Sequence, residues 1–140
     1  MEQQRRLLHG DITRVVLGAF YAVHNELGFG FLEAVYRNAI AVLLSRASVP
    51  VQREIPFPVV FHGVQVGFYR ADLIVADSVL VEVKTGRDIA PEHVSQLRNC
   101  LRASAIEVGL LLHFGRRATF RRLVMTKGRS RHSESPREFE

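Results

Sequence analysis

The chain has 140 residues, a length that suits one compact domain, and 47% of them are hydrophobic, enough for a real core. No apolar run is long enough to cross a membrane, and the first ten residues hold no signal-peptide core. The single cysteine, Cys100, excludes an intramolecular disulfide and a cysteine-based zinc site. These features predict a cytoplasmic protein that does not enter a membrane.

The net charge of +5 is unevenly distributed along the sequence. Seven basic residues and no acid lie between Gly115 and Arg131. Such a cluster favours a polyanionic partner, most commonly nucleic acid. The alternative is an arginine-rich composition with a basic tail, since 17 of the 19 basic residues are Arg. Phe120 is the only aromatic residue in the cluster, so the sequence does not indicate a base-stacking surface.

The first part of the chain has helical periodicity. Apolar residues repeat at helical spacing over residues 11–27, with Asp11 as the expected N-cap and Gly28 as the stop. A second apolar stripe predicts a helix over residues 31–45, and Pro50 closes this helical half.

The period then changes to two, which predicts strands. Pro56 and Pro58 restrict the first strand to an edge of the sheet or break it. A single domain is expected over residues 1–126, followed by a basic, disordered tail over residues 127–140. The expected elements are strands at 51–61, 64–75, 79–85, 108–114 and 119–125, and a helix at 90–103.

This order of elements predicts an α/β fold. The helix between the third and fourth strands would cross over right-handedly and place both strands in the same sheet. The result would be a small mixed β-sheet flanked by helices.

Charged side chains interrupt the most apolar hairpin. Because side chains alternate along a strand, Glu82 and Lys84 point to the same face. A turn centred on Asp77 would place Asp72 opposite Glu82, where two carboxylates repel unless a cation lies between them. The alternative is a solvated polar face of an antiparallel hairpin. Apolar flanks on both faces, and a Lys at position 84 in a chain with only two, favour a functional site.

Carboxylate oxygens are the hard ligands that Mg²⁺ or Mn²⁺ prefers. Asp72 and Glu82 would supply two of them, and the carbonyl of Val83 could add a third. Lys84 could position a water or stabilise the charge that builds up on a phosphate. This set describes metal-assisted phosphodiester hydrolysis.

Asp72 followed by Glu82-Val83-Lys84 resembles the PD-(D/E)xK nuclease superfamily, whose fold is restriction-endonuclease-like. Gly30, Glu33 and Tyr36 also resemble the signature of its GxxExxY branch. The resemblance covers roughly residues 10–125 and implies a Mg²⁺- or Mn²⁺-dependent nuclease acting on DNA.

The resemblance also implies a role for each matching residue. Asp72 and Glu82 would hold the metal, and Lys84 would be the catalytic lysine. Glu33 would be a further acid near the metal, and Gln96 would face the active site from the following helix. Glu33 could instead be a first-turn acid that favours the helix dipole, and Gln96 a solvent-facing residue.

Two departures from the family pattern stand at Phe29, where proline is common, and at Cys100, where an aromatic residue is common. Tyr36 lies on the apolar stripe and is interpreted as a core residue with a hydrogen-bonded hydroxyl. Two other functions stay open: a nucleic-acid-binding module with this fold and no cleavage activity, and an interaction domain that forms a homodimer.

Overall fold

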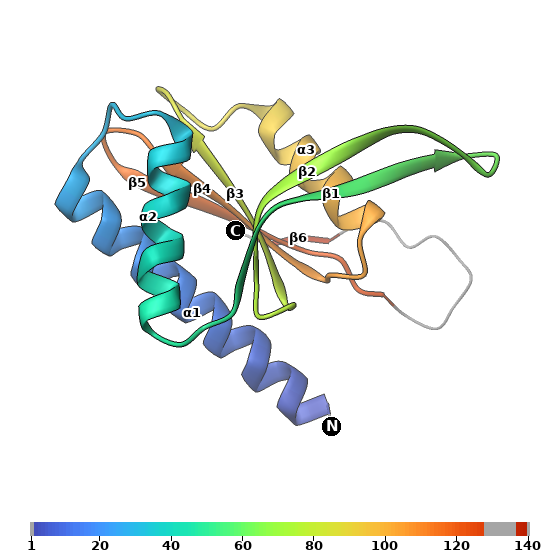
Figure 1. Cartoon of the computed structure of the whole chain (residues 1–140), viewed down its shortest axis with the longest axis horizontal. Coiled ribbons are helices and arrows are strands. Elements are labelled where there is room, and N and C mark those ends of the chain that lie inside the picture. The colour runs from blue at the N-terminus through green and yellow to red at the C-terminus, as the bar shows by residue number, and fades with distance from the viewer. Residues whose placement is uncertain (1, 128–136, 140) are drawn as a thin grey trace.

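The computed structural model describes residues 2–127 and 137–139, which form three helices and one six-stranded sheet. The sheet has the strand order β1-β2-β3-β4-β5-β6, and β3 and β4 pair in parallel while the other neighbours are antiparallel. The predicted α/β fold with a mixed sheet is therefore confirmed (Figure 1). The elements are α1 (Glu2–Leu27), α2 (Glu33–Arg46), β1 (Val51–Phe61), β2 (Val64–Val75), β3 (Val79–Thr85), α3 (Pro91–Ala103), β4 (Val108–Phe114), β5 (Ala118–Val124) and β6 (Arg137–Phe139).

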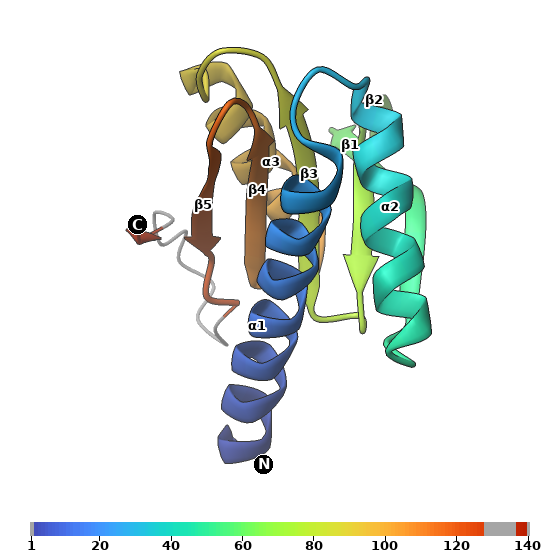
Figure 2. The ribbon, with the colours of Figure 1, turned by 90° about the vertical axis from the view of Figure 1, so that its left-hand side faces the viewer.

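Helices α1 and α2 cover one face of the sheet and α3 covers the other (Figure 2). Strand β3 is buried between these layers, and its side chains alternate between two hydrophobic cores. Val81 and Val83 pack in the core beneath α1 and α2, whereas Leu80 packs with Leu97 beneath α3. Glu82 therefore shares the face of Leu80, toward α3.

Helix α1 begins at Glu2, so the predicted start at residue 11 and the N-cap role of Asp11 are wrong. Gly10 lies inside the helix, where it costs about 1 kcal/mol relative to alanine and does not stop the helix. β1 is the edge strand that its two prolines predict. Strand β6 was not predicted, and the rest of the predicted tail, 128–136 and 140, lies outside the described residues.

β2 belongs to two different ladders. It pairs with β1 along its whole length, and the two strands form a ribbon that extends beyond the helices (Figure 1). It pairs with β3 only from Leu73 opposite Val81 to Val75 opposite Val79. The next residues in this register, Asp72 and Glu82, lie where the two strands separate. The separation makes room for side chains that a continuous ladder would crowd.

Tyr36 ties the α1–α2 connection to the core. Its ring is fully buried and stacks on Phe114 with ring centroids 4.0 Å apart. Its hydroxyl donates to the carbonyl of Gly28 at 2.7 Å and accepts from the N–H of Phe31 at 3.2 Å. The interpretation of Tyr36 as a core residue with a hydrogen-bonded hydroxyl is confirmed.

We expect Tyr36→Phe to destabilise the fold by roughly 1–3 kcal/mol, because two backbone groups lose a buried partner while the ring packing is kept. Chemical denaturation of the variant measures this loss. Tyr21→Phe is a matched control, since Tyr21 is 42% exposed. Equal unfolding midpoints for Tyr36→Phe and wild type would show that the hydroxyl contributes nothing to the fold.

Candidate metal centre at the junction of β2 and β3

A cleft of about 400 Å³ opens at the separation of β2 and β3. It gathers five of the six residues singled out from the sequence, and they come from both helices and strands. They are Glu33 of α2, Asp72 of β2, Glu82 and Lys84 of β3, and Gln96 of α3. The fold therefore brings together side chains that are more than sixty positions apart in the sequence.

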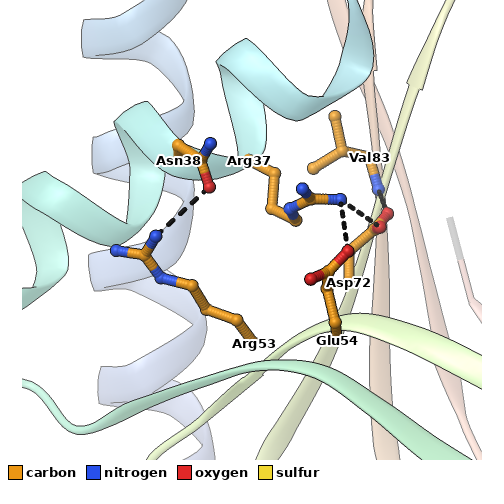
Figure 3. A network of polar contacts seen from close by, with 6 residues as sticks. All are labelled: Arg37, Asn38, Arg53, Glu54, Asp72 and Val83. Atoms are coloured by element: carbon orange, nitrogen blue, oxygen red, sulfur yellow. Dashed lines mark hydrogen bonds and ion pairs between the residues drawn. The ribbon is translucent and has the colours of Figure 1, made fainter.

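Asp72 replaces a backbone acceptor in the sheet. The β2–β3 ladder ends at Leu73 and Val81, and the N–H of Val83 donates to Oδ2 of Asp72 at 2.7 Å. The other carboxylate oxygen, Oδ1, lies 3.6 Å from Nη1 of Arg37, which is also 3.6 Å from Oε1 of Glu54 (Figure 3). Both oxygens are oriented by the protein, and each keeps a further lone pair for a ligand.

Glu82 is the most deeply buried acid of the cleft, with 8% of its surface exposed. Burial raises the pKa of its carboxyl to about 8, helped by the negative charge of Asp72, while the charge of Lys84 opposes the rise. Its Oε1 has no hydrogen-bond partner among the described residues. A buried carboxylate with an unpartnered oxygen beside a second carboxylate is an unfavourable arrangement unless a proton or a cation joins it.

A divalent cation fits these two acids. Mg²⁺ usually takes one or two carboxylates from the protein and keeps several waters. Asp72 and Glu82 would be the two carboxylate ligands, and within the described residues no group of three or more His, Cys, Asp or Glu side chains could hold a metal ion. Cys100 also lines the cleft, but burial raises the pKa of its thiol to about 12, which keeps it protonated at neutral pH.

The remaining predicted residues surround this pair in different ways. Lys84 is half-buried, two positions after Glu82 on the same strand. Glu33 and Gln96 are exposed residues that line the opening. Val83 does not line the cleft with its side chain, which packs in the core under α1 and α2, and it meets Asp72 through its N–H. Coordination by its carbonyl stays a prediction.

Arg37 was missed from the sequence. It lies four positions after Glu33 on α2, a spacing that commonly produces an ordinary ion pair on a helix surface. In the fold its guanidinium instead lies against Asp72, and its Nε is buried without a hydrogen-bond partner among the described residues. Only the packing of α2 beside β2 reveals that Arg37 offsets the charge of the acidic pair.

We expect Arg37→Leu to lower the stability of the metal-free protein by roughly 1–3 kcal/mol, because Asp72 loses its positive neighbour in a mostly buried position. Added Mg²⁺ or Mn²⁺ should then raise the thermal midpoint of the variant more than that of wild type, since the cation replaces the lost charge. Thermal unfolding with and without metal measures both effects. An equal or smaller metal-induced shift in the variant would contradict this role.

A mixed sheet between helices, with an acidic pair and a lysine where two strands separate, is the arrangement of restriction-endonuclease-like cores. The sequence matches the model of the PD-(D/E)XK nuclease superfamily over residues 10–123, so the chain belongs to that superfamily. Relatives of this class generally use divalent metals, in keeping with the acids found here.

A search of curated proteins gave no match. Among solved structures, one described as "Crystal structure of SSO0001" is 21% identical, with a TM-score of 0.47. The match covers 85% of this chain and 60% of that one. Of the helices described, none is both long and apolar enough to cross a membrane.

Proposed function

We propose that this protein is a Mg²⁺- or Mn²⁺-dependent nuclease that hydrolyses phosphodiester bonds of DNA. The observation that carries the proposal is the pairing of Glu82, buried with an unpartnered oxygen, with Asp72 beside the ammonium of Lys84 in one cleft. Superfamily membership supports a nuclease, whereas the metal and the DNA substrate are part of the proposal.

Each residue of the cleft would have its own role in this mechanism. Asp72 and Glu82 would hold the ion, and Arg37 would keep the Asp72 carboxylate oriented. When bound, the ion would neutralise charge on the phosphodiester and favour ionisation of the attacking water. Lys84 would stabilise the negative charge that grows on the phosphate, or position the water. Glu33 and Gln96, at the opening, would contact that water or the substrate.

Membership of the GxxExxY branch is part of the same proposal. Gly30, Glu33 and Tyr36 carry the motif of the GxxExxY branch, and the hydrogen bonds of Tyr36 give that motif a physical role in the α1–α2 connection. The homodimer and the cytoplasmic location stay predictions from the sequence.

Cleavage of supercoiled plasmid, linear duplex and single-stranded oligonucleotide tests the proposal directly, each with Mg²⁺, with Mn²⁺ and with a chelator. We expect cleavage that requires the metal. Folded protein that cuts none of these DNA forms, nor an RNA oligonucleotide, would overturn the proposal. That result would favour the alternative function, a nucleic-acid-binding module without cleavage activity.

A further inference from the structure

A second and larger cleft, of about 1170 Å³, lies at one end of the sheet. Three connections that are far apart in the sequence form it: residues 28–32 between α1 and α2, residues 86–90 after β3, and residues 115–117 between β4 and β5. All three lie at the same end of the sheet (Figure 2). The volume lies just above the range of about 300–1,000 Å³ typical of small-ligand pockets.

The cleft is strongly basic. Arg87, Arg116, Arg117 and Arg121 line it, against one acid, Asp88. His113 also lines it, but burial lowers the pKa of its imidazole, so this side chain adds no positive charge at neutral pH. The charge comes from arginine guanidiniums, which are suited to phosphate oxygens.

Two exposed aromatic rings stand beside these arginines. Phe29 is 56% exposed and Phe31 is 47% exposed, although both rings would be expected inside the protein. The guanidinium of Arg116 lies over the ring of Phe29, 5.7 Å from its centroid. The basic cluster itself holds only one aromatic residue, Phe120; the two exposed rings come from the α1–α2 connection, more than eighty positions away in the sequence.

The basic cleft adjoins the acidic one. Leu32 and Thr85 line the basic cleft, while the next residue on α2, Glu33, and the preceding residue on β3, Lys84, line the acidic cleft. The two clefts are therefore lined by sequence neighbours at the same end of the sheet.

Arginines that follow a backbone, combined with rings on which unpaired bases can stack, are the means by which proteins bind single strands. A duplex keeps its bases stacked inside, so it offers phosphates and groove edges but no free base faces for stacking. We propose that this cleft binds single-stranded nucleic acid, with bases stacked on Phe29 and Phe31 and phosphates on Arg116 and Arg117, and leads it to the acidic pair. Only the delivery of the strand to the acidic pair rests on the proposed nuclease function. The binding of the strand in the basic cleft does not depend on it.

Fluorescence anisotropy tests the binding, with a labelled thymidine oligonucleotide and a labelled duplex of equal length in the presence of a chelator. We expect Phe29→Leu to weaken binding of the single strand about tenfold, since stacking contributes about 1–3 kcal/mol per base, and to change duplex binding less than twofold. Arg116→Ala should weaken binding to both and reduce the salt dependence of single-strand binding by about 0.7 in log–log slope.

Arg46→Ala is the matched control, because Arg46 is an exposed arginine at the other end of α2. It should leave both affinities unchanged. An unchanged single-strand affinity in Phe29→Leu, or an equal loss for single strand and duplex, would overturn the inference. Because these measurements need no metal and no cleavage, wild type that binds without cutting would count against the nuclease alone.

Discussion

Replacement of Lys84 by alanine is expected to lower the rate of metal-dependent DNA cleavage by about 10²- to 10³-fold, the usual effect of removing one group that stabilises charge in the transition state. The ammonium stands two residues after Glu82 in the cleft of the acidic pair. It forms no hydrogen bond within the described residues, so its loss should cost the fold little. Single-turnover cleavage with saturating metal measures the chemical step.

Two further variants make this result specific. Arg102→Ala removes an exposed positive charge from the last turn of α3, away from the cleft, and should cleave like wild type. Lys84→Ala itself should bind the oligonucleotide in chelator within about threefold of wild type. Cleavage by Lys84→Ala within threefold of wild type would remove this residue from the mechanism and leave the acidic pair without its proposed partner.

A divalent ion is expected to stabilise the wild-type fold and not the Glu82→Gln variant. At a free ion concentration about 100 times Kd, binding to the native state alone contributes about 2.7 kcal/mol. The amide of glutamine keeps the size of the side chain but carries no charge for the ion. Differential scanning fluorimetry with Mg²⁺, Mn²⁺ and chelator measures the shift. An equal shift in the variant would place the ion elsewhere.

The pH dependence of the metal-free protein tests the same group. The pKa of Glu82 in the folded state, about 8, is above its ordinary value of 4.5, so folding favours the protonated form. This contribution is fully present below pH 4.5 and is lost as the pH rises through 8. The thermal midpoint of wild type should therefore fall relative to that of Glu82→Gln by roughly 8 °C across this window, with half of the corresponding free energy, about 2.4 kcal/mol, expressed as stability.

Parallel measurements in Mg²⁺ should remove most of this pH dependence, because the ion favours the ionised carboxylate. Wild type and Glu82→Gln with the same pH profile in chelator would show that the carboxyl is not held protonated by its surroundings. Comparison with the variant is needed because His113, whose pKa is lowered, changes stability in the opposite direction.

Periodicity predicted best the strands whose apolar runs are bounded by clear turn residues. The bounds predicted for β2, β3 and β4 match the structure, because apolar runs with turn residues between them leave little choice. The start of α1 was missed because the sequence offered Asp11 as a cap while the helix continues through Gly10. Strand β6 could not be predicted, since a short polar segment forms a strand only when a neighbour such as β5 supplies the partner.

The site residues also divide into those that local spacing could predict and those that it could not. Asp72, Glu82 and Lys84 are brought together by one hairpin, whose register depends on local turn geometry, and so their convergence could be predicted from spacing. Arg37 and Phe29 could not be assigned in this way. Their partners, Asp72 and Arg116, come from other parts of the chain, and only tertiary packing makes these pairs.

The hydrogen bond from Val83 to Asp72 makes that aspartate a structural part of the sheet as well as a candidate ligand. A mutation at this position would remove the acceptor of the Val83 N–H together with a candidate ligand, so it would weaken the contact between β2 and β3 as well as the proposed site. A chain with this fold and no cleavage activity would therefore still need an acceptor at this position. Lys84 makes no comparable hydrogen bond within the described residues. Its presence or absence in related chains is therefore a better indicator than Asp72 of whether they have the proposed chemistry.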